Sequence, residues 1–217
     1  MSMRMRKKKN LVPRQQKCNN VFIREPMPFR GKWLEDRVET EVHIEIGCGK
    51  GNFTVQTADA LRNVLHIGIE RVPEAMLIAM ERAVNLALTN LLFVDLDAAS
   101  LADIFAPSEV DRIYLNFSDP WKPPRQAKRR LTSPNFLQIY QHILKPGGEI
   151  HIKTDNTVLF AYSKRTLTDH GFDLHEVTDD LHKHGIHGFL TDYEQRFIQQ
   201  GMHIHRLVAR WNGRDNT

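Results

Sequence analysis

The chain of 217 residues is poor in cysteine and contains no long apolar run. Its two cysteines, Cys18 and Cys48, are too few for the set of disulfides that stabilises small secreted domains, so a reducing cytoplasm is expected. No window approaches 18 uninterrupted apolar residues, so we expect no membrane-spanning helix. The first residues are basic but lack an apolar stretch, so we expect no secretory signal. These absences favour a cytoplasmic globular protein.

Acidic residues are missing from two stretches of the chain. Residues 1–24 contain eight cations and no acid, and residues 122–130 contain five cations and no acid. The net charge of the whole chain is only +4, so the remainder is acidic. Basic runs bind phosphate groups by releasing counterions, although a solvated surface or a disordered tail has the same composition. The five cations of the second run are Lys122, Arg125, Lys128, Arg129 and Arg130.

Residues 1–40 are rich in cations and proline and show no clear periodicity. We predict that they form a basic arm that is mobile or is ordered by a partner. Residues 41–217 are predicted to form a single domain, because strand and helix patterns alternate through them.

The alternation predicts a Rossmann-like, doubly wound α/β fold with helices on both faces of a mostly parallel seven-stranded sheet. Strands are expected at 42–46, 64–69, 91–94, 110–117, 149–153, 172–177 and 203–211. Helices are expected at 52–62, 73–88, 98–105, 134–144 and 156–170. Because no convincing helix joins the last two strands, we predict an antiparallel hairpin at one edge. Residues 179–200 show no pattern that can be assigned.

A glycine-rich turn, Gly47-Cys48-Gly49-Lys50-Gly51, follows the first strand and is preceded by Glu45. Glycines at a strand-to-helix turn allow positive φ and close approach of a ligand. The dinucleotide fingerprint would need a glycine at Asn52, and a P-loop would need Ser or Thr after Gly49-Lys50. The pattern is instead similar to motif I of methyltransferases that use S-adenosylmethionine. A turn needed only for packing is the alternative.

Acids follow the second and third strands. Glu70 lies about twenty residues after the glycines, which suits a hydrogen bond to ribose hydroxyls. Asp97 can accept a hydrogen bond from an adenine amino group, and we prefer it to Asp95. A plain N-cap of the next helix is the alternative for Asp97.

The fourth strand ends in Asn116-Phe117-Ser118-Asp119-Pro120-Trp121, directly before the second basic run. Open α/β sheets bind ligands at the carboxyl ends of their strands. Asp119 is therefore a candidate for holding a polar reacting group beside a site for a polyanion, which predicts chemistry on a nucleic acid. Asp155, after the next strand, is the second candidate, with helix capping as its alternative.

These motifs together resemble the bacterial tRNA (guanine-N7)-methyltransferase family. The resemblance spans about residues 40–211. It rests on the glycine turn, on Asp119-Pro120-Trp121 ahead of Lys128-Arg129-Arg130, and on Thr191-Asp192-Tyr193-Glu194. It implies a class I methyltransferase that uses S-adenosylmethionine and modifies a guanosine in the variable loop of tRNA, at position 46.

The resemblance also implies roles for individual residues. The cofactor pocket would be lined by Glu45, Gly47, Gly49, Gly51, Glu70, Asp97 and Asp119. The substrate would be contacted by Asp155, Thr191 and Glu194, and the RNA by Arg125, Lys128 and Arg129. The family usually has a lysine where this chain has Pro123, so we predict that the preceding Lys122 makes that nucleotide contact, with a neighbouring arginine as the alternative.

Guanine N7 has a free lone pair, so its methylation needs no prior removal of a proton. Alignment of N7 with the methyl group is then the main requirement. We predict that Asp119 is the catalytic residue, because a carboxylate can accept hydrogen bonds from N1–H and N2–H of guanine and so orient the base. Phe117 and Trp121 either stack on the base or pack against the sheet.

Two other functions are considered. A methyltransferase of the same fold acting on a small molecule or a protein leaves the basic segments unexplained, and one acting on another RNA is a further alternative. A non-enzymatic RNA-binding module would not need Glu45, Glu70 and Asp97 together. No metal is expected, because His182, His184 and His187 match no familiar metal-site spacing. The partner is tRNA rather than a membrane, and monomer and homodimer both remain open.

Overall fold

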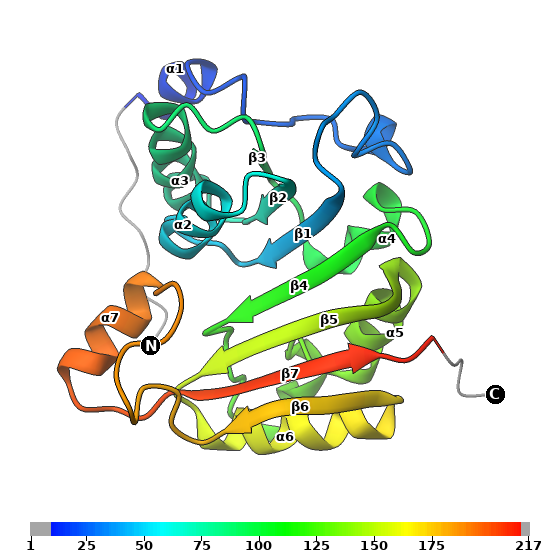
Figure 1. Cartoon of the computed structure of the whole chain (residues 1–217), viewed down its shortest axis with the longest axis vertical. Coiled ribbons are helices and arrows are strands. Elements are labelled where there is room, and N and C mark those ends of the chain that lie inside the picture. Colours follow the sequence, from blue (N-terminus) through cyan, green and yellow to red (C-terminus); the bar gives the residue numbers. More distant parts are fainter. Residues whose placement is uncertain (1–9, 214–217) are drawn as a thin grey trace.

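The computed structural model describes residues 10–213 and is built around one seven-stranded sheet (Figure 1). The strand order is β3-β2-β1-β4-β5-β7-β6. Five neighbouring strands pair in parallel, in the order β3, β2, β1, β4 and β5. Strand β7 is antiparallel to both of its neighbours, β5 and β6. The predicted mostly parallel sheet with an antiparallel edge hairpin is therefore confirmed. The strands are β1 (Glu41–Ile46), β2 (Val64–Ile69), β3 (Leu91–Val94), β4 (Val110–Asn116), β5 (Leu144–Thr154), β6 (Phe172–Thr178) and β7 (His205–Trp211).

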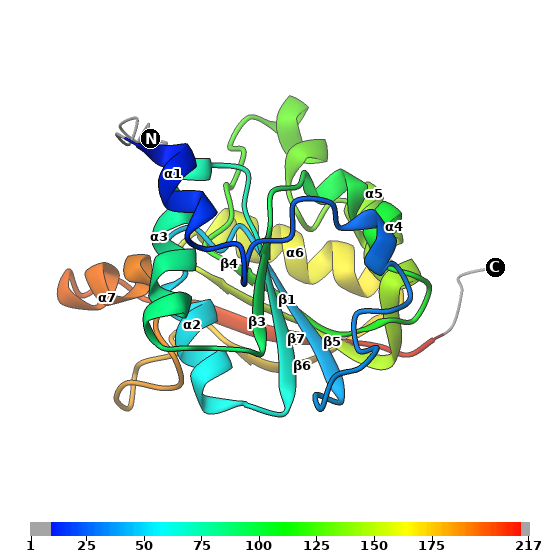
Figure 2. The same ribbon diagram turned by 90° about the horizontal axis from the view of Figure 1, so that it is seen from above.

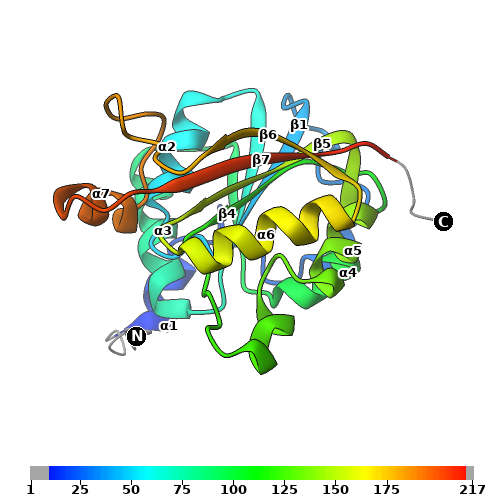
Figure 3. The ribbon, with the colours of Figure 1, turned by 90° about the horizontal axis from the view of Figure 1, so that it is seen from below.

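Helices cover both faces of the sheet, as predicted. Side chains of α1 to α3 belong to one buried apolar cluster, and those of α4 to α6 belong to another. Figure 2 shows α1 beside α3, and Figure 3 shows α5 and α6 together next to β5 and β7. The helices are α1 (Leu11–Gln16), α2 (Asn52–Ala60), α3 (Pro73–Asn85), α4 (Leu101–Ile104), α5 (Pro134–Ile143), α6 (Thr157–Asp169) and α7 (Asp192–Gln199), with short 3-10 helices η1 (Met27–Phe29), η2 (Ala98–Ser100) and η3 (Pro124–Arg129).

The helix boundaries follow local chemistry. Pro73 and Pro134 stand in the first turns of α3 and α5, where a missing N–H costs nothing. The side chain of Asn156 accepts a hydrogen bond from the Leu159 amide at 2.8 Å and caps α6. Gly171 follows α6 with a φ of 76°, as a helix-terminating glycine does.

The described part of the predicted basic arm packs against the domain. Ile23 and Val21 exchange backbone hydrogen bonds with Phe93 of β3, at 2.9 and 2.7 Å. The indole of Trp33 is buried and donates to the Ile104 carbonyl at 2.8 Å. Residues 10–40 are thus placed by the domain itself, while the division of the chain at residue 40 stays a prediction. The cations from Arg4 to Lys9 lie outside the described residues.

Helix α7 occupies the stretch that the sequence pattern left unassigned. It begins with a capping box, in which Thr191 Oγ1 accepts from the Glu194 amide and the Glu194 carboxylate accepts from the Thr191 amide. The Thr-x-x-Glu pattern was therefore a usable helix signal. Between residues 10 and 213, no helix has the length and apolar character needed to cross a membrane.

The burial of two histidines predicts that the folded state is less stable in mild acid. His43 and His66 are each 2% exposed, and burial lowers the pKa of both to about 3. The unfolded chain binds these protons near pH 6.5, so the free energy of unfolding should fall as the pH drops from about 6.5 towards 3. The loss should reach about 2 kcal/mol per histidine at pH 5.

Urea unfolding at pH 8 and pH 5 measures this effect. His66→Phe should lessen the loss of stability between pH 8 and pH 5, because one of the two histidines no longer titrates. An unchanged dependence in that variant would show that His66 is not buried in its neutral form.

Candidate active site

One edge of the sheet gathers most of the predicted site residues. Parallel strands end at the same edge, so the turns after β1, β2, β4 and β5 lie side by side. Ile46 pairs with Ile69, which places the glycine turn next to Glu70. Asn116 pairs with Lys153, which places the loop of Asp119 next to that of Asp155.

The glycine turn combines tight packing with open space. Gly47, Gly49 and Gly51 all have positive φ, at 79°, 57° and 74°. A Cβ at Gly51 would lie 2.5 Å from the Cβ of Ala79, so this glycine allows α2 to pack against α3. A Cβ at Gly47 or Gly49 would meet nothing within 4 Å. The first two glycines therefore leave room for a ligand against the backbone.

Glu45 lies buried beneath this turn at the end of β1. Its two carboxylate oxygens accept hydrogen bonds from the hydroxyl of Thr54 and, at 2.9 Å, from the amide of Asn116. Burial raises the pKa of Glu45 to about 7, although both hydrogen bonds act to lower it. A cationic group bound above the turn would favour the ionised carboxylate.

Glu70 and Asp97 lie at the ends of the neighbouring strands. Glu70 accepts hydrogen bonds from the Gly49 amide at 2.9 Å and from the amides of Arg71 and Val72 at 2.8 Å. Asp97 accepts from the Ala99 amide at 3.0 Å and pairs with Arg71 at 2.7 Å. Asp97 thus performs the capping role that was its alternative, and its contact with adenine stays a prediction.

Asp119 is exposed on the loop after β4, and among residues 10–213 its side chain has no hydrogen-bond partner. Phe117 and Trp121, on either side of it, have positive φ values of 53° and 42°. The ring of Phe117 lies beside α7, 6.4 Å from the ring of Tyr193 and 5.7 Å from that of Phe197. The Trp121 ring lies 4.0 Å from the guanidinium of Arg129. Both aromatics therefore have protein partners.

The central part of the basic run forms η3, and the cations of the run are of two kinds, exposed and buried. Lys122, Arg125, Lys128 and Arg129 are exposed, as an RNA-contacting surface requires. Arg130 is only 5% exposed and donates to the carbonyl oxygens of Pro120 and Trp121 at 2.9 and 3.3 Å. The sequence pattern contains no signal that separates Arg130 from its neighbours.

Thr191 and Glu194 form the cap of α7. Asp155 lies elsewhere, in a pocket of about 620 Å³ whose lining also includes Asp179, Asp180, Lys183 and Met202. Glu194 is fully buried, and Lys153 Nζ lies 3.0 and 3.1 Å from its two oxygens. The structure does not place Thr191 and Glu194 in the pocket of Asp155. Their contacts with a substrate stay predictions.

Lys153 is a residue that the sequence analysis missed. Burial lowers its pKa, and the ion pair with Glu194 acts in the opposite direction. The His182 side chain also lies 2.8 Å from the Glu194 carboxylate, so the segment that carries His182 is attached to α7 through this carboxylate. In the part of the chain that the structure describes, no group of three or more His, Cys, Asp or Glu side chains is arranged to hold a metal ion.

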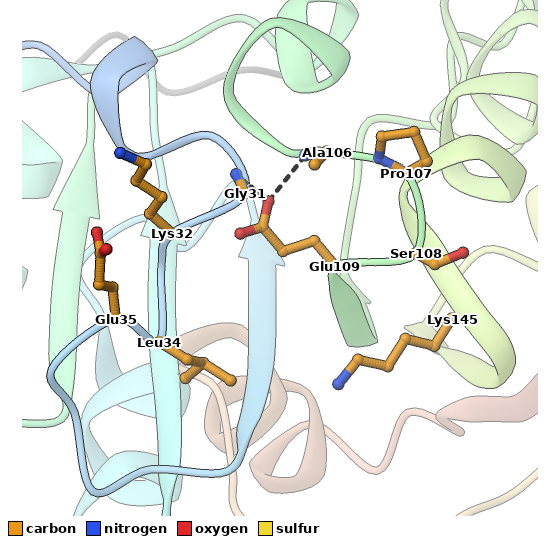
Figure 4. A pocket seen from close by; sticks show the side chains of 9 residues that line it. All are labelled: Gly31, Lys32, Leu34, Glu35, Ala106, Pro107, Ser108, Glu109 and Lys145. Carbon is orange, nitrogen blue, oxygen red and sulfur yellow. Dashed lines mark hydrogen bonds between the residues drawn. The ribbon is translucent and has the colours of Figure 1, made fainter.

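A second pocket, of about 490 Å³, lies at the other end of the parallel strands, where β4 begins (Figure 4). Figure 4 shows Glu109 directed towards Gly31 and Ala106, whose amides donate to it at 2.9 and 2.8 Å. Because this pocket adjoins the start of β4, it is about 20 Å from Asp119 at the far end of that strand. None of the predicted site residues lines it.

Comparison with known proteins identifies the family. A family model described as "Putative methyltransferase" matches residues 39–207. A tRNA (guanine-N(7)-)-methyltransferase of Lachnoclostridium phytofermentans is 46% identical over 194 residues, which cover 88% of this chain and 91% of the relative. The chain belongs to the tRNA (guanine-N(7)-)-methyltransferase family. A second tRNA (guanine-N(7)-)-methyltransferase, from Lactococcus lactis, is 38% identical over 96% of this chain and 98% of its own length.

Solved structures support the same fold. The 16S rRNA methyltransferase KamB superposes with a TM-score of 0.65 at 16% identity, over 83% of this chain and 92% of KamB. An antibiotic-related methyltransferase gives a TM-score of 0.58 at 20% identity, over 80% of this chain and 87% of that one. The predicted Rossmann-like class I methyltransferase fold and the predicted resemblance to the tRNA (guanine-N(7)-)-methyltransferase family are both confirmed.

Proposed function

We propose that this chain transfers the methyl group of S-adenosylmethionine to N7 of a guanine in tRNA, at position 46 of the variable loop. The near full-length similarity to proteins named for this activity carries the proposal. The glycine turn and Asp119 at one sheet edge, next to exposed cations of η3, support it. We propose that the protein acts in the cytoplasm, because its proposed substrate is tRNA.

The residues around the glycine turn fit S-adenosylmethionine, which supplies an activated methyl group on a positively charged sulfur. The open space at Gly47 and Gly49 lets a ligand approach the backbone. Glu45 suits the amino group of the methionine part, Glu70 the ribose hydroxyls and Asp97 the adenine amine. A carboxylate oxygen has lone pairs for more than one donor, so the present hydrogen bonds of these acids leave acceptor capacity.

Asp119 has the exposure and freedom from protein partners that a base-orienting group needs. Its carboxylate accepts two hydrogen bonds side by side, which matches N1–H and N2–H of guanine. Because N7 already has a lone pair, Asp119 positions the base and balances the charge on it and need not remove a proton.

The exposed cations of η3 are proposed to bind the phosphates of tRNA. Replacing Arg125, Lys128 and Arg129 by alanine should weaken binding and reduce the slope of log K against log salt by about 2 to 3. Binding of a tRNA transcript at several salt concentrations measures the slope. The control is Lys32→Ala with Arg62→Ala, at the opposite sheet edge, and an equal change in both variants would remove the RNA role from η3.

Pro123 stands where the family usually has a lysine, so we propose that Lys122, which is also exposed, makes that nucleotide contact. Lys122→Ala should raise the KM for tRNA while leaving the melting temperature unchanged.

The oligomeric state, monomer or homodimer, stays a prediction that light scattering can decide.

The function is tested by incubating the protein with an unmodified tRNA transcript and S-adenosylmethionine. Chemical cleavage at N7-methylguanosine then identifies the modified nucleotide. The expected result is a single cleavage at position 46. Methylation of another base, or of small molecules alone, would favour a different methyltransferase, and no binding of S-adenosylmethionine in calorimetry would favour an RNA-binding module.

A further inference from the structure

The Asp119 loop needs a support that its own sequence does not supply. Asp119 and its neighbours belong to no helix or strand, and the Asp119 side chain is exposed. Phe117 and Trp121 hold positive φ, which aromatic L-residues rarely adopt. Such backbone conformations persist only where the surrounding structure imposes them, and they cluster at functional sites.

Arg130 supplies contacts to this loop. Its Nε donates to the Pro120 carbonyl at 2.9 Å and its Nη2 to the Trp121 carbonyl at 3.3 Å. These are the two residues directly after Asp119, and Trp121 is one of the two with positive φ. A planar guanidinium with several fixed donors suits two adjacent carbonyls, which a single ammonium group does not match.

Arg130 is itself held by α6. Its guanidinium lies 4.4 Å from the centre of the Tyr162 ring. Two residues further on, the hydroxyl of Thr132 meets that of Ser163 at 2.8 Å, and the Thr132 carbonyl accepts from Thr166 at 2.8 Å. The segment that carries Arg130 is thus attached to a rigid element behind the sheet edge.

The environment of Arg130 separates it from an RNA-binding cation. It is 5% exposed, and within residues 10–213 no carboxylate pairs with it, so its charge is balanced by carbonyl oxygens and a ring. The adjacent Arg129 is exposed and lies over the Trp121 ring. Two consecutive arginines therefore contact the same loop, Arg129 at the Trp121 ring and Arg130 at the backbone carbonyls.

We propose that Arg130 is a positioning residue, which holds the backbone after Asp119 so that its carboxylate orients the guanine. The proposal rests on the methyl transfer proposed above. It assigns the cations of one run to different tasks, because Lys122, Arg125, Lys128 and Arg129 face solvent whereas Arg130 faces the loop. Since Arg130 directly follows η3, it links η3 to the Asp119 loop through the backbone carbonyls, in addition to the contact of Arg129 with the Trp121 ring.

Arg130→Lys tests the proposal because it keeps the charge and removes the planar fork. We expect kcat to fall about a hundredfold, as for a misplacement of about 1 Å, with KM values for tRNA and S-adenosylmethionine within about twofold. The matched control is Arg165→Lys, an exposed arginine of α6 whose guanidinium lies 5.9 Å from the same Tyr162 ring, and it should leave kcat unchanged.

A second measurement does not depend on activity. Trp33 and Trp211 are 1% and 3% exposed, so acrylamide reaches mainly the half-buried Trp121. Quenching should increase in Arg130→Lys and stay unchanged in Arg165→Lys. If Arg130→Lys does not fold, Tyr162→Leu removes the ring that supports the guanidinium and should lower kcat and increase quenching in the same way.

The outcomes separate this inference from the proposed function. A wild-type protein that does not methylate tRNA refutes the function, whereas the quenching result still decides whether Arg130 holds the loop. An unchanged kcat in folded Arg130→Lys, or a loss that lies wholly in the KM for tRNA, would overturn the positioning role. The latter result would make Arg130 an RNA contact like its neighbours.

Discussion

Asp119→Asn should reduce methyl transfer about a thousandfold while tRNA binding remains within about twofold, because we propose that Asp119 orients the reacting base whereas the cations of η3 hold the RNA. The substitution keeps the size of the side chain and replaces a charged acceptor by an amide. The measurements are single-turnover methylation of a tRNA transcript and a filter-binding assay on the same samples.

The control for Asp119 is Asp169→Asn, which alters an exposed aspartate at the end of α6, away from the glycine turn. It should retain full activity. Near-normal turnover in Asp119→Asn would remove Asp119 from the reaction and leave Asp155 as the second candidate for orienting the guanine. Equal losses of activity and tRNA binding would instead show that Asp119 contributes to RNA binding.

Glu194→Gln should lower the free energy of unfolding by about 3 kcal/mol, because it leaves the buried ammonium of Lys153 without its counter-charge. Lys153 is 8% exposed and Glu194 fully buried, so water does not replace the lost partner. Glutamine can still complete the capping box with Thr191, so the loss reports the charge pair and not the helix cap. Urea unfolding at pH 8 measures the change.

The matched control is Asp192→Asn, two residues earlier in the same helix. Asp192 pairs with Arg82 at 3.7 Å, and both side chains are 37% exposed, so the change should cost less than about 1 kcal/mol. Adding Lys153→Met to Glu194→Gln should restore part of the lost stability, since it removes the unpaired charge. A Glu194→Gln variant that keeps its stability but has a raised KM would support the substrate contact implied by the family resemblance.

The sequence predicted the central architecture because its signals are local. The strand at 64–69 and the strand at 91–94 agree with β2 and β3 residue by residue, since buried parallel strands are short apolar runs. Asn156 and Pro134 mark helix starts through contacts within one turn. The glycine turn and the acids Glu45, Glu70 and Asp119 fall at strand ends, and parallel topology alone brings strand ends together.

The segments that sequence reasoning placed less well depend on contacts between distant residues. Residues 10–40 become ordered through Phe93 and Ile104, which lie about seventy positions further along the chain. Helix α7 has only eight residues and is mostly polar, so its few apolar residues are too short a pattern to predict a helix, and its capping box is the clearer signal.

The sequence by itself determined the fold class and the family, and it predicted the sheet edge at which we propose that the chemistry takes place. The tertiary structure alone decided what individual charged side chains do there: Arg130 faces inward beside the exposed Arg129, and Glu194 is buried against Lys153, which is 41 positions away in sequence. Local periodicity specifies helices and strands, but whether a charge is solvated or buried depends on which distant elements pack around it.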